Sequence, residues 1–447
     1  MGKMQRRIDR VVSSANRWMR YPSYSMEWRR VSSTAYASPE HEPQWQELRS
    51  KLPPVVKQHF DERWSKDRPP AASAVPFEPL PEYQTDIIYT GTFKADAHKD
   101  LAALRQHRPD IKITALMSGP MRRETDFVRR LCDDVVFVRT QAQFVRFLLN
   151  ARAKALVFQG GDDQFALLTS CIWPGRLVWQ VRDTNLRIPR QYLSDLTYER
   201  AKFIAERADA ILTFHSEDGW KNLTDIQFRS PPRCIPPLCV PSIGPRCYLP
   251  KLSANDGGIH VVHASSVGRV GGNHSGTINF TQADFLQKFR SIAEQGVHMH
   301  VYSPHLDRET PEMKEYFDLQ RSSQYFHIHR ALPFEQLLET LTQYDWGMLH
   351  VTWQKEYLLP GFDRPVQNGL VQHIQSGLPV IVSPTAVGNA DLVRNTGRGI
   401  VVDERDIPRL RQLLEQRKDL PRHCRETPLE PSLLYDAGTF GRAVLGE

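Results

Sequence analysis

The chain has 447 residues, of which 40% are hydrophobic and 24% are charged, and its formal net charge at pH 7 is +7. This length is enough for two domains of ordinary size, and the composition is that of a globular protein rather than a disordered one. No apolar run approaches the roughly 18 residues that a membrane-spanning helix requires, so the sequence predicts no helix that crosses a bilayer.

The positive charge is concentrated in the first 30 residues, which hold eight Lys or Arg against two acids and carry a net charge of +6. At 100° per residue their apolar and basic side chains fall on opposite faces, which predicts a basic amphipathic helix. Such a helix can lie in an anionic membrane interface, where each basic residue adds about 1 kcal/mol. Two alternatives stay open: a helix packed on the folded body, and an organelle transit peptide.

The rest of residues 1–80 has little periodicity, and the segment RPPAASAVPFEPLPEY is typical of an extended linker. From about Thr85, apolar runs alternate with helical stretches, which predicts a parallel sheet with crossover helices in residues 81–245. The apolar runs lie at residues 87–89, 111–117, 135–138, 155–158, 177–181 and 210–214.

Residues 230–250, SPPRCIPPLCVPSIGPRCYLP, contain too many prolines for a regular element and indicate a linker or hinge. A second alternating series starts at residue 259, so residues 246–425 are predicted to form a second α/β domain, followed by a tail at 426–447. Two doubly wound units joined in this way place a ligand cleft between the carboxyl ends of both sheets.

The six cysteines are scattered through a chain too large to need disulfides, which favours a reducing, cytoplasmic location. Cys234, Cys239 and Cys247 lie close together in sequence. The paired CxxC spacing of four-ligand zinc sites is missing there, so we predict no metal site among them.

Residues 368–382, NGLVQHIQSGLPVIV, contain the most informative pattern in the chain. A helix with one apolar face runs into Gly377, which can adopt the left-handed conformation that ends a helix, and Pro379 prevents the helix from resuming. Residues 380–382 then suit a strand that is buried on both faces. A small-residue loop, SPTAVGNA, a short helix and a second apolar run at 399–402 follow.

This block resembles the nucleotide-sugar-binding domain of retaining GT-B glycosyltransferases of the family 4 type, whose pattern is roughly NKLFEYLASGLPVI, a small-residue loop, an acidic residue and GxxV. Other segments are similar to further motifs of that family: ERADAILTFHSE at 206–217, IHVVHASS at 259–266 with a possible turn at Gly276 and Thr277, and HRALPFEQLLETLTQYDWGMLH at 329–350. The resemblance spans residues 85–420. It implies two Rossmann-like doubly wound domains that face a cleft.

In that family an Arg and a Lys after the first strand of the second domain clamp the donor diphosphate. The resemblance makes Arg269 the candidate for the Arg, but Ser275 stands at the position of the Lys. The glycine-rich run around them, with Gly268, Gly271 and Gly272, can cradle phosphate through backbone N–H groups or can be a surface hairpin. Lys355 and Arg364, which precede Asn368, are candidates for the missing cation.

Family members commonly hold the donor ribose with a Glu five residues before the glycine of SGLP, where this chain has Gln372. Glutamine can accept and donate hydrogen bonds but carries no charge, so we expect lower donor affinity or a shifted nucleotide. The more N-terminal Glu of the same motif aligns with Arg364. The remaining donor-binding residues that the resemblance implies are Leu332 and Pro333 near the base, Asn368, and Asp391 after the small-residue loop.

In the first domain, Arg182 and Asp183 follow a predicted strand at a position where relatives commonly have His-Asp. Arginine offers charge there but cannot carry a proton near pH 7. Asp183 can bind an acceptor hydroxyl or cap the next segment. His215 and His263 lie at strand ends and are expected to be structural.

The resemblance implies a retaining glycosyltransferase of the hexosyltransferase type, with Arg182, Asp183 and Arg269 as catalytic residues. It would move a sugar from a nucleotide-sugar donor to a glycan or lipid-linked glycan, as in polysaccharide biosynthesis, without a metal or other cofactor and without nucleic acid. We expect a cytoplasmic protein that can lie on the inner face of a membrane. Two alternatives remain: a nucleotide-sugar epimerase, and a non-catalytic GT-B-like binding or assembly subunit, suggested by the residues at positions 182, 275, 364 and 372.

Overall fold

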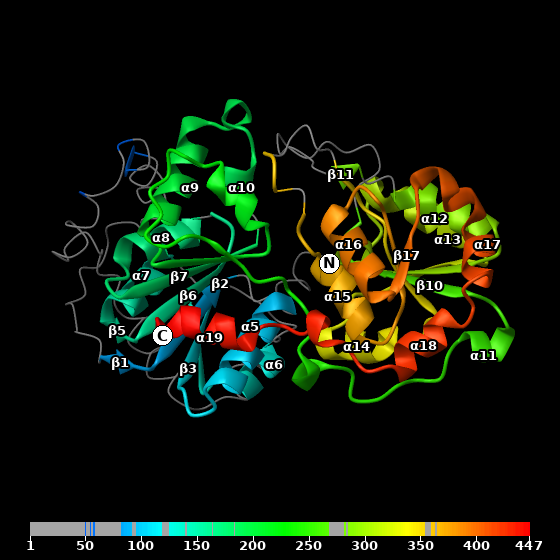
Figure 1. Cartoon of the computed structure of the whole chain (residues 1–447), viewed down its shortest axis with the longest axis horizontal. Coiled ribbons are helices and arrows are strands. Elements are labelled where there is room, and N and C mark those ends of the chain that lie inside the picture. Colours follow the sequence, from blue (N-terminus) through cyan, green and yellow to red (C-terminus); the bar gives the residue numbers. More distant parts are fainter. Residues whose placement is uncertain are drawn as a thin grey trace, which may run out of the picture.

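The structure, a computed structural model, describes residues 82–91, 95–118, 125–138, 141–162, 164–182, 184–267, 281–282, 285–353, 359–362 and 364–447, with isolated positions at 50, 54, 57 and 58. These residues form two α/β domains that lie side by side (Figure 1). The predicted basic helix in residues 1–30 lies outside the described residues. Within the described part, no helix is long and apolar enough to span a membrane.

The first domain is built on a seven-stranded sheet in the order β4-β3-β2-β6-β7-β8-β9, and every neighbouring pair is parallel. Strands β2 and β6 are buried along most of their length, as expected for a sheet covered by helices on both faces. The strands are β2 (Ile87–Gly91), β3 (Ile113–Ser118), β4 (Asp134–Val138), β6 (Ala155–Gly160), β7 (Arg176–Val181), β8 (Ala210–Thr213) and β9 (Arg233–Cys234). The helices are α5 (Ala95–His107), α6 (Thr125–Leu131), α7 (Gln141–Asn150), α8 (Gln164–Ile172), α9 (Asp195–Arg207) and α10 (Glu217–Lys221).

The second domain has a six-stranded parallel sheet in the order β13-β12-β10-β14-β16-β17. Its strands are β10 (His260–Ala264), β12 (His298–Tyr302), β13 (Phe326–His329), β14 (Trp346–Leu349), β16 (Val380–Val382) and β17 (Gly399–Val401). Its helices are α11 (Ser253–Asp256), α12 (Phe285–Glu294), α13 (Lys314–Ser322), α14 (Phe334–Leu341), α15 (Asn368–Gln375), α16 (Val387–Thr396), α17 (Leu410–Glu415) and α18 (Leu420–Glu426). The predicted class, two doubly wound parallel-sheet domains, is confirmed.

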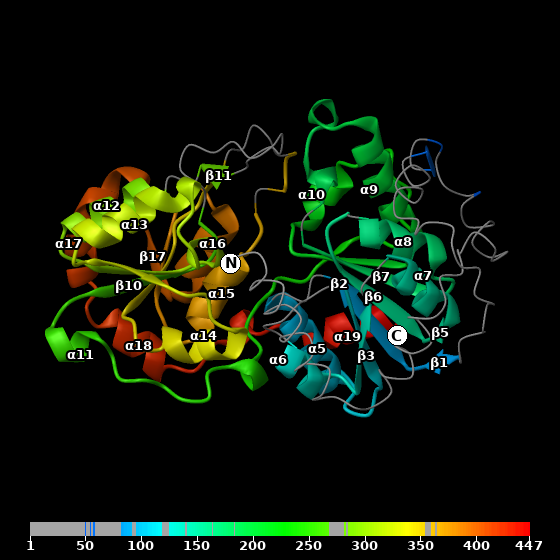
Figure 2. The ribbon, with the colours of Figure 1, turned by 180° about the vertical axis from the view of Figure 1, so that it is seen from behind.

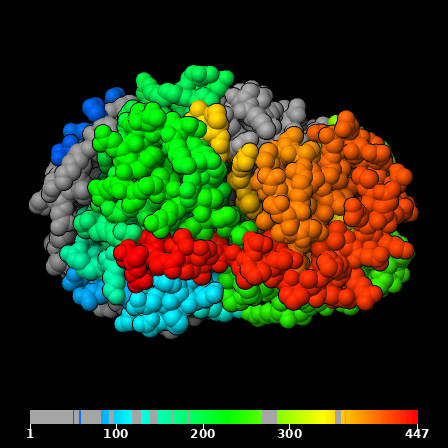
Figure 3. Space-filling view, in the orientation of Figure 1, coloured from blue at the N-terminus to red at the C-terminus, as the bar shows by residue number. Residues whose placement is uncertain are grey.

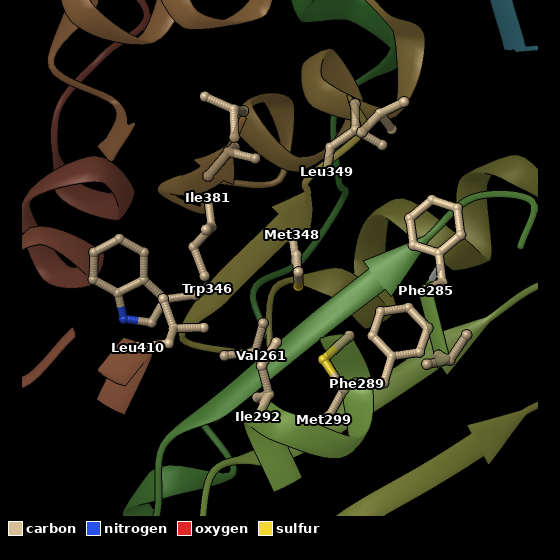
Figure 4. Close-up of a cluster of buried hydrophobic side chains, with 14 of the residues drawn as sticks. Val261, Phe285, Phe289, Ile292, Met299, Trp346, Met348, Leu349, Ile381 and Leu410 are labelled. Carbon is tan, nitrogen blue, oxygen red and sulfur yellow. The ribbon is translucent and has the colours of Figure 1, made fainter. Parts of the chain in front are cut away.

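Helix α12 packs with one face on the sheet of the second domain. The apolar residues of α12 recur at helical spacing, so they all lie on this face and are buried. Figure 4 shows Phe285, Phe289 and Ile292 of α12 beside Val261 and Met299 of the strands, in the same cluster as Met348 and Ile381.

The joint between α15 and β16 is also confirmed. Helix α15 ends at Gln375, and Gly377 follows with φ +74°, the left-handed conformation that ends helices. The N–H of Leu378 donates to the carbonyl oxygen of His373 at 3.0 Å, which closes the last turn. Strand β16 begins at Val380 and is fully buried.

The C-terminal residues, expected from the sequence as a tail at 426–447, return to the first domain. Helix α19 (Ala437–Leu445) lies beside α5 in both ribbon views (Figures 1 and 2), and Phe440 and Val444 are buried in the first-domain core. Arg176 donates to the carbonyl oxygens of Ala443 at 2.7 Å and Val444 at 3.1 Å. The space-filling view shows this segment in red, crossing both domains (Figure 3).

Candidate functional site

A short segment of the second domain, residues 359–362, packs into the first domain and bridges the two. Phe362 is 1% exposed, and its ring centroid lies 5.6 Å from that of Trp220 and 5.4 Å from that of His215. The N–H of Leu359 donates to the carbonyl oxygen of Arg187 at 2.9 Å. We call residues 359–362 the bridging segment. They lie on the path from β14 to α15, so α15 is connected directly to the domain boundary.

Helix α5 makes a second contact across the boundary through side chains that are fully buried. The ammonium of Lys99 donates to the carbonyl oxygen of Pro237 at 2.5 Å and to Oδ1 of Asn368 at 3.1 Å. Next to it, the ring of His98 packs on Phe334 of α14 with a centroid distance of 4.8 Å. Asn368, a predicted donor-binding residue, therefore lies where the two domains meet.

A buried polar group surrounds Asp100 near the carboxyl ends of the first-domain strands. One carboxylate oxygen of Asp100 accepts from the Tyr89 hydroxyl at 2.6 Å and from Nε2 of Gln159 at 3.2 Å, and the other accepts from the Tyr435 hydroxyl at 2.7 Å. Burial raises the pKa of Tyr89 well above its usual range, the Asp100 charge adds to this effect, and the Arg182 guanidinium opposes it. Arg182 therefore lies close enough to this group to act on it electrostatically.

Arg182 follows β7 at the carboxyl edge of the sheet, as predicted. Its N–H donates to the carbonyl oxygen of Gly160 at 3.3 Å, and its own carbonyl oxygen accepts from Nε2 of His215 at 3.2 Å. A carbonyl oxygen can only accept, so this contact fixes the tautomer of His215 with its proton on Nε2. Asp183, the other predicted catalytic residue of this domain, lies outside the described residues.

On the second domain, the N-terminus of α15 has no side-chain capping hydrogen bond within the described part of the chain, although Gln367 occupies the capping position. A methyl group added at Gly369 would lie 3.2 Å from Leu349 and 3.8 Å from Ser265, so this terminus lies beside the residues that end or follow β14 and β10. An uncapped helix N-terminus presents free backbone N–H groups and positive potential, which suit a phosphate group.

Helix α16 holds the segment ahead of α15 in place. The N–H of Gln367 donates to Oδ1 of Asn389 at 2.9 Å, and Nδ2 of Asn389 donates back to Oε1 of Gln367 at 2.7 Å. A methyl group at Gly388 would lie 2.4 Å from the carbonyl oxygen of Arg364. The small residues of the loop after β16 therefore allow α16 to approach this segment closely.

The other predicted donor-binding residues fall into two groups. Gln372 lies one helical turn after Asn368 on the same face of α15 and is 9% exposed. Leu332 packs at the carboxyl ends of β10 and β12, against a cluster that contains Ala264 and Tyr302, and Pro333 is the N-cap of α14. Pro333 precedes Phe334, which packs on His98 beside the contact between Lys99 and Asn368.

Two predicted residues have a different setting. Asp391 is half-exposed and pairs with Arg394 of its own helix at 3.2 Å, which is a surface contact. Arg364 is exposed. The pKa of Asp218 is lowered mainly by Lys221, and the charge of Arg364 makes a smaller contribution in the same direction. Arg364 therefore faces α10 of the first domain. Gly268, Arg269, Gly271, Gly272 and Lys355 lie outside the described residues.

Comparison with solved structures identifies the arrangement of the two domains. HepE of Anabaena in complex with UDP and glucose has a TM-score of 0.57 and 13% identity, covering 81% of this chain and 98% of its own. The same protein in complex with UDP-glucose has a TM-score of 0.56 and 14% identity, with the same coverage. A protein of Listeria monocytogenes assigned as a UDP-N-acetylglucosamine 2-epimerase has a TM-score of 0.50 and 10% identity, covering 80% of this chain and 94% of its own.

The chain has the GT-B fold. No protein-family model matches the sequence, and the search of curated proteins found no match. The similarity to these proteins is therefore seen in the three-dimensional structure, while the sequence identity is only 10–14%. In this GT-B arrangement, the carboxyl ends of β2, β6 and β7 and those of β10 and β14 border the domain boundary described above.

Sequence reasoning missed the buried polar residues of the first domain: Lys99, Asp100, Gln159 and Tyr435. The run His98-Lys99-Asp100 gave no signal, because three consecutive polar residues are typical of an exposed helix face, and their burial is seen only in the structure. Tyr435 gave none, since its partner is 335 positions away in the sequence.

Proposed function

We propose that this GT-B protein is a glycosyltransferase of the hexosyltransferase type, which moves a sugar from a nucleotide-sugar donor to an acceptor glycan. One observation carries the proposal: the uncapped N-terminus of α15 lies beside Ser265 at the carboxyl ends of the second-domain strands, next to the domain boundary. Structures with the same fold hold UDP and UDP-glucose, which supports a donor of that class. Retention of the anomeric configuration is part of the proposal.

The donor would bind to the second domain. Its diphosphate would accept hydrogen bonds from the first N–H groups of α15, with Arg269 and the glycine-rich run as further partners. These groups would stabilise the negative charge that grows on the leaving phosphate, which is the main demand of sugar transfer. The ribose would lie near Gln372 and the base near Leu332 and Pro333. This chemistry requires no metal ion.

The acceptor would bind to the first domain near Arg182 and Asp183. The guanidinium of Arg182 would hold an acceptor or sugar hydroxyl but would not carry its proton. Closure of the two domains would exclude water and so favour transfer over hydrolysis. We propose a glycan or lipid-linked glycan as the acceptor, as in polysaccharide biosynthesis.

The test introduces one negative charge at the proposed diphosphate site. In the Asn368→Asp variant the new carboxylate can still accept from Lys99 and suits a helix N-terminus, so the fold is retained. Repulsion at roughly 5–6 Å and an effective dielectric constant of about 20 costs about 3 kcal/mol, so UDP affinity should fall on the order of 100-fold. Isothermal titration with UDP, GDP and ADP and their sugars measures this. Asn395→Asp, the same change at an exposed site on α16, is the control.

Equal nucleotide affinity of Asn368→Asp and the unmodified chain would contradict this placement of the diphosphate. No binding of any nucleotide by the unmodified chain would instead favour the non-catalytic subunit. That alternative is motivated by Gln372 and Arg182, which stand where the family pattern has Glu and His. An epimerase would convert the sugar of its donor without any acceptor, and product analysis by NMR separates that outcome from transfer.

We also propose that residues 1–30 attach the protein to an anionic membrane surface, because their net charge is +6. Deletion of residues 1–30 should remove most co-sedimentation with vesicles that contain anionic lipid, whereas co-sedimentation with neutral vesicles should not change on deletion. Equal binding of both forms to the anionic vesicles would contradict the membrane proposal.

A further inference from the structure

Five histidines form one array on a single face of the second-domain sheet. His260 of β10 lies opposite His298 of β12, and His300 of β12 lies opposite His327 of β13. His329 completes the set, because alternate residues of a strand point to the same face. The rings of His260 and His298 are stacked with centroids 4.4 Å apart and an angle of 7°, and those of His300 and His327 are 4.4 Å apart at 19°.

Hydrogen bonds connect this histidine array in two chains. Nδ1 of His260 lies 3.0 Å from Nε2 of His300, and Nδ1 of His300 lies 3.0 Å from Nε2 of His329. In the second chain, Nδ1 of His298 lies 3.1 Å from Nε2 of His327. Every link joins an Nδ1 to an Nε2, so all protons in a chain can point the same way.

Both chains end at one carboxylate. Nε2 of His260 lies 3.1 Å and 3.2 Å from the two oxygens of Asp256, and Nε2 of His298 lies 3.9 Å from one of them. The three donor atoms fall within 4.8 Å of one another. Asp256 is exposed at the end of α11, so an ion can reach this point from solvent.

Two proton arrangements keep every link of the array. In the first, each Nε2–H donates, and His260 donates to Asp256. In the second, each Nδ1–H donates, and the Nε2 atoms of His260 and His298 present lone pairs toward the carboxylate. The second arrangement brings three acceptors together without a proton, which is unfavourable unless a cation lies between them. The array can therefore change to a cation-binding form without losing an internal hydrogen bond.

We propose that Asp256, His260 and His298 bind a divalent transition-metal ion of the zinc class. Two imidazoles and a carboxylate, with solvent at the remaining position, are a donor set that such ions use. Tetrahedral zinc with bonds of about 2.0–2.1 Å needs ligand atoms about 3.3 Å apart. His260 and Asp256 already meet this spacing. The parallel ring of His298 must rotate about its Cβ–Cγ bond, a torsion with a broad minimum.

The other histidines have the role of supporting partners. When the ion binds Nε2 of His260 and His298, their Nδ1–H groups donate to His300 and His327, which orients both ligand rings. His260 and His300 are buried, with 4% and 5% exposure, so their positions are set by packing. The ion would link α11 to β10 and β12 and would stabilise this part of the fold.

This metal site is separate from the proposed donor site. His260 and His298 are the first residues of β10 and β12, whereas Ser265 and Leu332 lie at the opposite, carboxyl edge of the sheet. Metal binding and nucleotide binding can therefore succeed or fail independently, and the test below uses no nucleotide.

The experiment titrates Zn²⁺ into the untagged full chain after chelator treatment, and follows heat and melting temperature. We expect one ion per chain and a higher melting temperature. Asp256→Asn, a change at an exposed residue, and His298→Gln should each remove this binding. His327→Gln, which removes a supporting partner, should weaken it about 10–100-fold. His423→Gln, at an exposed histidine of α18, should bind as the unmodified chain does.

Co²⁺ spectra distinguish this site from a cysteine site such as one at the exposed Cys247. Histidine and carboxylate ligands give ligand-field bands in the visible range without a thiolate charge-transfer band. Absence of Zn²⁺ binding by the unmodified chain would overturn the proposal. So would a thiolate band, or unchanged Zn²⁺ affinity in both Asp256→Asn and His298→Gln.

Discussion

His263 gives the sharpest test of the second-domain core. It lies in β10 and is fully buried, with its ring centroid 4.9 Å from that of Phe285 and 5.4 Å from that of Phe289. Its Nδ1–H donates to the carbonyl oxygen of Met348 at 3.1 Å. Burial lowers the pKa of His263 to about 4, and the charge of the neighbouring His373 acts in the same direction.

The effect on stability follows from comparing the folded and unfolded states. In the unfolded chain the pKa of His263 is about 6.5, so between pH 6.5 and pH 4 the unfolded state binds a proton that the folded state does not. The stabilising contribution is complete above pH 6.5 and is lost as the pH falls toward 4. Between pH 7 and pH 5 the free energy of unfolding therefore falls by about 2 kcal/mol. This amount depends little on the pKa of His263 in the folded state, because that pKa lies below pH 5.

We expect His263→Leu to remove this part of the pH dependence. Urea unfolding of the unmodified chain and of the variant at pH 7 and pH 5 measures the free energy of unfolding in each case. The unmodified chain should lose about 2 kcal/mol more than the variant between the two pH values. The variant also loses packing and the hydrogen bond to Met348. These losses lower the free energy of unfolding equally at pH 7 and pH 5, so they cancel in the difference between the two pH values. His423→Leu, an exposed control, should behave as the unmodified chain, and an identical loss in His263→Leu would refute the reasoning.

Three further substitutions test contacts at the domain boundary and in the segment ahead of α15. Phe362→Ala should cost about 3–5 kcal/mol of docking energy, seen as faster hydrogen exchange around the bridging segment, and unchanged exchange would contradict this. Gly388→Ala places a methyl group 2.4 Å from the carbonyl oxygen of Arg364 and should cost about 1–3 kcal/mol in urea unfolding, together with weaker UDP binding. Lys99→Met leaves the carbonyl oxygen of Pro237 and Oδ1 of Asn368 without this donor, and should lower stability by about 1–3 kcal/mol; an unchanged melting temperature would argue against both contacts.

The sequence was sufficient where local chemistry decides the structure. The joint of α15 and β16 was predictable, since Gly377 ends the helix and Pro379 prevents its continuation whatever surrounds them. The alternation of strands and helices was predictable for the same reason. Helix α19 was not, because its apolar face is buried against α5 of the other domain, and sequence pattern alone does not name that partner.

The histidine array shows the same limit for a possible site. Each of the three strands contributes one or two histidines to the array. In the sequence these histidines stand within apolar runs, and such runs predict a strand but no site. The array appears once the register places His260 opposite His298 and His300 opposite His327. Cysteine spacing could be read from the sequence and was used to judge metal binding, whereas cross-strand pairing depends on three segments separated by more than 20 residues.

The low identity to other GT-B structures, 10–14%, limits what the fold says about function. Few positions in this architecture require a particular residue: Gly377 needs its positive φ and Gly388 its close backbone approach, but most core positions accept any apolar residue of suitable size. Site residues such as Gln372 and Arg182 can therefore differ while the fold persists. The function must therefore be argued from the residues of the site rather than from the fold. The Asn368→Asp variant tests that site directly, because it changes the charge at the N-terminus of α15 while keeping the contact to Lys99.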